Sequence, residues 1–223
     1  MSCPPFSQTK IKDKIKIKMA SCLTITNGIC RDCLDSVGGI KKAYLASMDS
    51  INTAIASFTL DNTDGHITDY SYNTGITALK WYPLVPQKNT SNYVETINIS
   101  AENGTLFYNG VLTMVFGKMT MLKLNTINEM AKGDIGIVFV DGNGKYWFLG
   151  GLNVTVTGGV PTLITIDETN GCTLGSTSFQ TGTAKADANG ASLTFTCDMQ
   201  HPVVEVVPGT NIAADFATAD ALC

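Results

Sequence analysis

The sequence predicts a mainly all-β fold, an antiparallel β-sandwich or partial barrel with one short packed helix. Short segments in which apolar and polar residues alternate recur at roughly ten-residue spacing, which is typical of sandwiches and barrels. Gly, Thr and Asn are plentiful between these segments, and long helical patterns are absent. Of the 223 residues 44% are apolar and 15% are charged, so we expect a folded globular protein.

The strongest local signal lies in Leu122–Leu149, a short helix followed by a β-hairpin. Thr126 and Glu129, three residues apart, predict a capping box at the start of the helix, and Gly133 is suited to its end. From Ile135 the apolar period changes to two. Because both faces of that strand are apolar, we expect it to be covered on both sides. The following Asp-Gly-Asn-Gly predicts the hairpin turn.

The remaining strands are predicted from alternation bounded by turn residues. They are Ile40–Leu45, Ile51–Leu60, Ile67–Tyr72, Tyr93–Ser100, Thr105–Tyr108, Val111–Phe116, Leu152–Thr157, Thr162–Asp167, Ser192–Cys197 and Val203–Val207. Gly75–Asn92 contains Pro83 and Pro86, and proline excludes a central strand. We therefore expect a long excursion there.

The predicted organisation is a flexible basic extension (1–18), a single β-sandwich domain (19–208) and a loosely held C-terminal tail (209–223). The net charge is −4, and residues 1–18 carry a local +4, which leaves −8 for residues 19–223. Such an acidic body disfavours nonspecific adhesion to nucleic acid and suits a surface past which DNA slides. Acidity that only keeps the protein soluble is the simpler interpretation. No apolar run approaches the ~20 residues of a membrane-spanning helix, so we expect a soluble protein.

Three cysteines near the amino terminus are weak candidates for a metal site. Cys30 and Cys33 have CxxC spacing, and Cys22 lies eight residues upstream. A structural zinc site needs four ligands, and its second pair usually repeats the close spacing. The cysteines Cys172, Cys197 and Cys223 are instead isolated, so we expect no metal site and no cofactor. The odd number of cysteines and the lack of an export signal favour reduced thiols.

The sequence offers no enzymatic mechanism, and we expect a protein without catalytic residues. His66 and His201 lie beside turn signals, outside any nucleophile-elbow context, so both are expected at surfaces or turns. The acidic residues mostly occupy turns or strand ends: Glu95, Glu102, Asp134, Asp141, Asp167, Glu168 and Glu205. The D-x-N-G sequences at 141 and 187 lack the later glycine and glutamate of a calcium loop, and turn chemistry explains both.

The order of these elements resembles a known family. The segments of this chain that carry the resemblance are, in order, GGIKKAYL (Gly38–Leu45), a helix ending in MAKG (Met130–Gly133), VFVDGNGKYWFLG (Val138–Gly150) and TGTAKADANGASLTF (Thr181–Phe195). Over approximately 19–207 the chain resembles virion structural proteins of tailed bacteriophages that infect Bacteroidota, most of all tail-tube-like proteins.

The resemblance implies a tail-tube-like β-sandwich that joins its neighbours' sheets into rings, commonly hexamers, which stack into a tube. Leu124–Lys132 would be a helix outside the barrel, and Gly75–Asn92 a loop reaching the adjacent subunit. The implied partners are further copies of the chain, other tail or connector proteins, and DNA that passes through the lumen without specific binding. No membrane partner is implied. The protein would assemble in the bacterial host cytoplasm and reside in the virion.

Two other classes stay open at this point. A head–tail connector or baseplate component would share the order of elements. A carbohydrate-binding β-sandwich would use exposed aromatic side chains, for which the sequence offers Trp81, Tyr82, Tyr93 and Tyr108.

Overall fold

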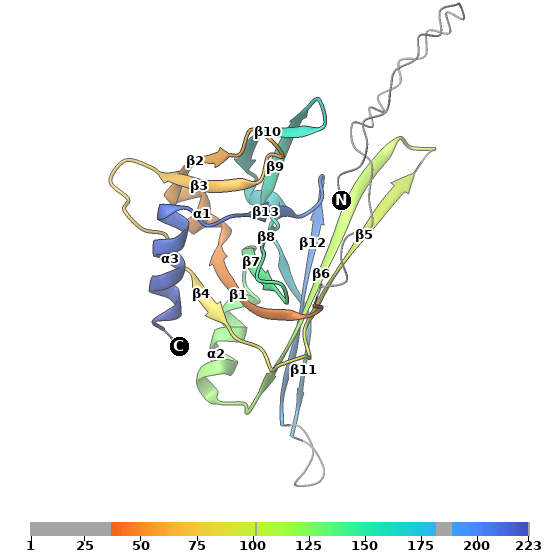
Figure 1. The fold of residues 1–223 in the computed structure, drawn as a ribbon. Coiled ribbons are helices and arrows are strands. Elements are labelled where there is room, and N and C mark those ends of the chain that lie inside the picture. Colours follow the sequence, from red (N-terminus) through yellow and green to blue (C-terminus); the bar gives the residue numbers. More distant parts are fainter. Residues whose placement is uncertain (1–36, 101, 182–188, 223) are drawn as a thin grey trace, which may run out of the picture.

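The computed structural model describes residues 37–100, 102–181 and 189–222 (Figure 1). The strands are β1 (Ile40–Ser47), β2 (Ile55–Leu60), β3 (Ile67–Tyr72), β4 (Tyr82–Leu84), β5 (Asn92–Ser100), β6 (Thr105–Gly117), β7 (Ile135–Asp141), β8 (Tyr146–Leu149), β9 (Leu152–Thr157), β10 (Val160–Ile166), β11 (Thr173–Gln180), β12 (Gly190–Met199) and β13 (Val204–Val206). The helices are α1 (Met48–Ala54), α2 (Met121–Met130) and α3 (Thr210–Asp220), with a 3₁₀ turn at Glu168–Asn170. The prediction of a mainly β, sandwich-like fold is confirmed, although the described chain has more than one helix.

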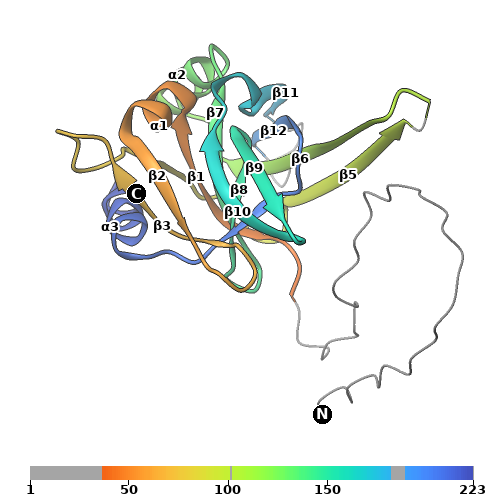
Figure 2. The same cartoon turned by 90° about the horizontal axis from the view of Figure 1, so that it is seen from above.

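Two large sheets form the sandwich. One has the strand order β2-β3-β13-β8-β7-β1-β4, and the other has the order β11-β12-β6-β5. A separate two-stranded sheet consists of β9 and β10. Neighbouring strands are antiparallel except β13 and β3, which pair in parallel at Val206 and Ile67. The four-stranded sheet covers one face of the seven-stranded sheet, and α1, α3 and the β9–β10 sheet lie towards the other (Figures 1 and 2).

Strand β7 lies in the middle of this arrangement and is covered on both sides, as predicted. Ile137 and Phe139 pack into the core between the two large sheets. Val138 and Val140 pack into a second core on the opposite face. Residues 135–140 are all buried, and β7 pairs with β8 in the predicted hairpin. Each apolar face of this strand therefore packs into a different core.

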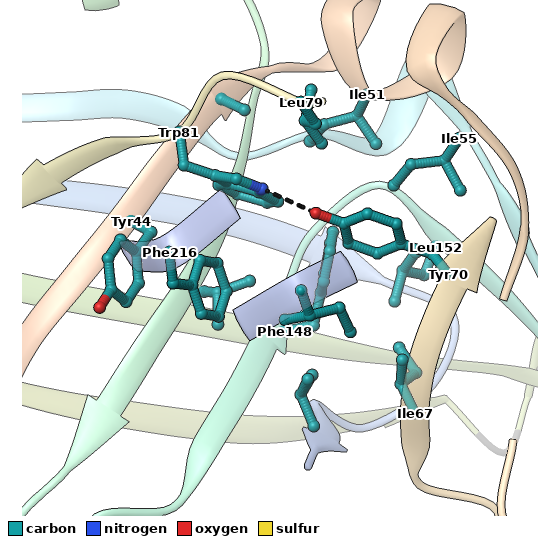
Figure 3. Close-up of a cluster of buried hydrophobic side chains, with 14 of the residues drawn as sticks. Tyr44, Ile51, Ile55, Ile67, Tyr70, Leu79, Trp81, Phe148, Leu152 and Phe216 are labelled. Carbon is teal, nitrogen blue, oxygen red and sulfur yellow. Dashed lines mark hydrogen bonds between the residues drawn. The ribbon is translucent and has the colours of Figure 1, made fainter. Parts of the chain in front are cut away.

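The second core is built around aromatic side chains from distant parts of the chain (Figure 3). The ring of Phe216 stacks on Tyr44 with centroids 4.1 Å apart and meets the edge of Trp81 at 5.7 Å. The indole Nε1 of Trp81 donates a hydrogen bond of 3.3 Å to the hydroxyl of Tyr70. This core thus ties the C-terminal helix to β1, β3 and the segment before β4.

The prediction of a loose tail over 209–223 is wrong, because Thr210–Asp220 forms α3. Ile212, Phe216 and Ala219 recur at helical spacing and are buried in the second core. In the sequence these three residues are separated largely by alanines, so composition alone favours a loosely held tail. Packing against an existing core supplies the stability that the helix lacks by itself.

Part of Gly75–Asn92, the segment expected to reach an adjacent subunit, packs on its own chain. Leu79 and Trp81 are buried in the chain's own second core, and Trp81 is only 1% exposed. The backbone N–H of Leu79 donates to the Asp215 carboxylate at 3.0 Å. The part of the segment around Leu79 and Trp81 is therefore anchored on its own subunit. Pro83 lies in β4, which is an edge strand, in agreement with the exclusion of a central strand.

The predicted capping box at Thr126 is wrong. Helix α2 begins earlier, with Thr120 as the N-cap whose hydroxyl accepts from the N–H of Lys123 at 3.3 Å. Thr126 lies inside the helix, and its Oγ1 donates to the carbonyl of Leu122 at 3.0 Å. A threonine whose hydroxyl donates to the carbonyl one turn earlier can lie inside a helix. The three-residue spacing between Thr126 and Glu129 therefore does not by itself mark the start of a helix.

The prediction of strand over Ile51–Leu60 is correct only for its second half. Met48–Ala54 forms α1, capped by Ser47, whose hydroxyl accepts from the N–H of Ser50. Met48, Ile51 and Ala54 are buried, at three-residue spacing that fits a helix. Because the helix is short, β-branched residues in it favoured the strand interpretation.

The prediction of reduced thiols is wrong for two cysteines, since Cys172 and Cys197 form a disulfide. Strand β11, which the alternation did not reveal, pairs with β12 so that Thr173 lies opposite Thr196. This register places the two cysteines directly opposite each other, with Cα atoms 4.4 Å apart. Their separation of 25 residues in sequence hides this contact.

Candidate functional site

In the part of the chain that the structure describes, the two histidines considered for catalysis lie in different surroundings. His201 lies in the bend between β12 and β13, in agreement with the prediction of a turn, but it is buried rather than at the surface. Its ring nitrogens lie against the carbonyls of Leu152 and Pro202. His66 is half-buried beside Asp64. Cys22, Cys30 and Cys33, and the second D-x-N-G sequence up to residue 188, lie outside the described residues.

The first D-x-N-G sequence behaves as a turn, as predicted. Oδ1 of Asp141 accepts from the N–H groups of Asn143 at 2.8 Å and Lys145 at 2.9 Å. The indole N–H of Trp147 donates to the other carboxylate oxygen at 3.3 Å. These bonds within the hairpin account for the aspartate without a metal ion.

Asp61, Asp64 and His66 bring ligand atoms within 4.8 Å of one another at the β2–β3 turn. Oδ1 of Asp61 accepts from the N–H of Thr63 at 2.7 Å, which lowers its pKa. The contact with the His66 ring lowers the pKa of Asp64. The carboxylates thus stabilise their own turn.

The aromatic residues considered for carbohydrate binding do not form an exposed set. Trp81 is buried in the second core, contrary to the expectation of an exposed ring. Tyr93 is half-buried against Phe139, with ring centroids 4.8 Å apart, and donates to Glu95 at 2.7 Å. Of the four, Tyr82 is exposed, and Lys80 Nζ lies 5.0 Å from the centroid of its ring.

The most unusual surface is the outer half of the β5–β6 hairpin, which projects away from the rest of the molecule (Figure 2). We call this part, 96–100 with 105–108, the arm. The pairing runs from Asn92 opposite Thr113 to Ser100 opposite Thr105. The inner half of the hairpin rests on the core through Leu112, whereas the arm extends past the end of the seven-stranded sheet.

The arm carries large aliphatic side chains that the described residues leave largely exposed. Ile99 is 74% exposed, Ile97 56% and Leu106 51%. Register places Ile99 opposite Leu106, on the same face of the sheet as the pair of Tyr93 and Leu112. In the body of the protein that face packs into the core. The core-facing pattern therefore continues for several residues beyond the core.

Both outer strands of the four-stranded sheet are long and lack a partner on their outer side in the described part of the chain. Strand β5 has nine residues and β11 has eight, and neither contains proline. Proteins usually protect such edges because they pair with other chains. The other large sheet follows this rule: β4 has three residues and contains Pro83, and the other edge strand, β2, lies against β10.

The directions of the two open edges are compatible with each other. Each neighbouring pair in the four-stranded sheet is antiparallel, so β5 and β11 run in opposite directions. If a second copy continued the sheet in the same orientation, its β11 would meet β5 as an antiparallel partner. Such a contact uses two different surfaces, and heterologous contacts of this kind close into rings or extend as filaments.

Sequence reasoning identified the alternating pattern of 93–100 but not its exposure. Alternation shows that a strand has an apolar face and does not show which chain covers that face. Strand β11 was missed because Thr173–Gln180 is rich in small polar residues.

No protein-family model matches the chain, and neither a curated protein nor a solved structure is significantly similar to it. None of the helices that the structure describes is long and apolar enough to cross a membrane.

Proposed function

We propose that the protein is a structural subunit that assembles with copies of itself into rings, and that these rings stack into the tail tube of a bacteriophage. The observation that carries the self-assembly is the arm, with its uncovered aliphatic face. An isolated two-stranded hairpin is marginally stable in water. We therefore expect the projecting arm to be stabilised by contact with another surface.

The energetics favour a protein partner for the arm. Fully burying one aliphatic side chain contributes about 1.5–3 kcal/mol, and the three side chains are each at least half exposed. Covering Ile97, Ile99 and Leu106 would thus contribute about 3–5 kcal/mol per contact. Backbone hydrogen bonds along β5 and β11 would add to this. A second copy of the chain would supply both a surface that covers the arm and a strand that pairs with the open edge, and this supports a ring.

The phage assignment rests on the order of elements in the sequence, from the strand at 38–45 to the segment at 181–195. On this proposal DNA passes through the channel of the stacked rings. A head–tail connector or baseplate ring is the second candidate, because the same arm and edges support a single ring equally well.

The test is negative-stain electron microscopy and sedimentation of the purified full chain, compared with two variants. Ile99→Asp places a charge on the arm, and Val156→Asp places one on β9, where Val156 is similarly exposed at 54%. We expect wild type and Val156→Asp to form stacked rings with a central channel, and Ile99→Asp to remain monomeric with an unchanged circular dichroism spectrum.

A wild-type protein that stays monomeric would refute self-assembly. Equal loss of assembly in both variants would refute the role of the arm. Rings that do not stack would favour the connector or baseplate candidate over the tube.

A further inference from the structure

A cavity of about 340 Å³ lies beside Val37–Ile40, the segment that leads into β1. Its volume is within the range of about 300–1,000 Å³ that is typical of small-molecule sites. One wall comes from the start of β5 in the four-stranded sheet. The other comes from the seven-stranded sheet, where β7 and β8 approach their turn. The cavity is therefore a recess between the two large sheets.

Three aromatic rings line this recess, which we call the aromatic cavity: Tyr93, Phe139 and Trp147. Phe139 is buried, whereas Tyr93 and Trp147 are half-buried. The rings of Tyr93 and Phe139 lie with centroids 4.8 Å apart. The hairpin register places Trp147 directly opposite Phe139, and all three side chains pack at the core between the two large sheets. Rings from both sheets thus converge on one space.

Both rings that carry a polar hydrogen donate it to a carboxylate. The indole N–H of Trp147 donates to Oδ2 of Asp141 at 3.3 Å. The hydroxyl of Tyr93 donates to Oε2 of Glu95 at 2.7 Å. The same oxygen of Glu95 accepts from the N–H of Val203 at 3.0 Å, which holds this carboxylate in place. Such bonds fix the two rings, and because hydrogen-bonded groups polarise one another they also make the rings richer in electrons.

The electrostatic character of the aromatic cavity is negative. Asp141 lines it, and the described residues that line it include no lysine, arginine or histidine. Lys145, on the same hairpin, is not among the lining residues, and its ammonium pairs with Glu205 at 2.8 Å. Its Nζ nevertheless lies 5.9 Å from the centroid of the Trp147 ring. This indole is therefore placed where it attracts a cation.

We propose that the aromatic cavity binds a small organic ammonium ion whose nitrogen carries methyl groups, such as choline. The faces of aromatic rings are negative, and they attract cations, tryptophan most strongly. A methylated nitrogen has an apolar surface that packs against rings, and it has no N–H donor that the rings would leave unsatisfied. The carboxylate of Asp141 complements the positive charge and would repel an anion. This inference goes beyond the proposed function and does not depend on it, because one chain supplies all of these groups.

The test is ligand-observed NMR of the purified full chain with choline chloride at constant ionic strength. Saturation transfer to the methyl signal of choline is titrated to obtain Kd. The comparison ligand is neohexyl alcohol, which has the shape of choline with a carbon in place of the charged nitrogen. We expect choline to bind about 5–30-fold more tightly than the alcohol, a ratio that corresponds to one or two cation–π contacts.

Variants of the lining residues locate the binding. Trp147→Leu should weaken choline binding about 5–30-fold, and Trp147→Phe should weaken it less, because tryptophan is the better partner for a cation. Asp141→Asn removes the charge and keeps an acceptor for the turn, so it should weaken binding of choline and not of the alcohol. Tyr82→Leu is the matched control, since Tyr82 is an exposed ring that does not line the cavity, and it should bind choline as wild type does.

Four results would overturn the inference. They are the absence of saturation transfer to millimolar choline in wild type, equal affinity for choline and the alcohol, unchanged choline binding in Trp147→Leu, and an equal loss of binding in Tyr82→Leu. Circular dichroism checks the fold of each variant, and Trp147→Phe and Asp141→Asn carry the test if Trp147→Leu does not fold. Assembly is measured separately by microscopy, so failure of this site and failure of the proposed function are distinguishable.

Discussion

Replacing Asp215 by alanine is expected to weaken the docking of α3 through the loss of buried hydrogen bonds. Asp215 is 3% exposed, and one of its oxygens accepts from the hydroxyls of Tyr70 at 2.5 Å and Tyr72 at 2.8 Å and from the N–H of Leu79 at 3.0 Å. The carboxylate therefore joins α3, β3 and the segment before β4 at one point.

The magnitude follows from the donors that alanine would leave without a partner. Tyr70 is buried and the Leu79 N–H lies in a buried contact, and an unsatisfied buried donor costs about 1–3 kcal/mol. The half-exposed Tyr72 hydroxyl can turn to water. We therefore expect a loss of about 4 kcal/mol from the free energy of unfolding, which corresponds to a fall of about 8–16 °C in Tm for a domain of this size.

A graded series separates this network from general damage to the core. Asp215→Asn keeps a neutral acceptor of the same size and should cost about 2 kcal/mol, because bonds to a charged group are roughly twice as strong. Tyr70→Phe should cost about 2 kcal/mol, and Tyr72→Phe about 1 kcal/mol or less. Thr218→Ala, on the exposed side of the same helix, is the control and should stay within about 0.5 kcal/mol of wild type.

The assay is urea unfolding followed by fluorescence, since Trp81 lies beside Tyr70 in this core. If Asp215→Ala does not fold, Asp215→Asn and Tyr70→Phe still test the expected order of destabilisation among the variants. The reasoning is refuted if Asp215→Ala unfolds within 0.5 kcal/mol of wild type, or if Tyr72→Phe costs as much as Asp215→Ala.

Three further predictions concern other parts of the fold. Replacing both Cys172 and Cys197 by alanine should lower the free energy of unfolding by about 3–4 kcal/mol, because the disulfide closes a 25-residue separation; an unchanged Tm under reductant would contradict this. Gly190→Ala should cost about 2–3 kcal/mol, since its Cβ would lie 2.0 Å from the Phe116 carbonyl, whereas Gly133→Ala, with open space around it, should be close to neutral in the same thermal unfolding assay. Burial raises the pKa of Tyr44 to about 12 from the 10 of an unfolded chain, so its contribution is complete below pH 10 and is lost as the pH rises towards 12. Urea midpoints should fall over that window, less steeply in Tyr44→Phe, and equal slopes would argue against this role.

The hairpin at 135–149 was predictable because its signals are local. The alternation of Ile137, Val138 and Phe139 shows two apolar faces, and the Asp-Gly-Asn-Gly turn requires glycine at Gly144, where φ is +89°. The backbone hydrogen bonds of such a hairpin connect residues close in sequence.

Other features were not predictable, because they depend on contacts between distant segments. Phe216 anchors α3 on a core contributed by β1 and β8, and its neighbours in sequence are mostly alanine and aspartate. Cys172 meets Cys197 because of the β11–β12 register.

By itself the sequence determined the fold class, the central hairpin and most strands, since period and turn chemistry act over a few residues. Tertiary structure alone decided which apolar faces are covered by the chain itself. Ile99 and Phe139 occupy equivalent alternating positions in their strands, yet the first is exposed on the arm and the second is buried between sheets. The physical reason is that burial depends on where the sheets end in space, and no local pattern encodes that boundary.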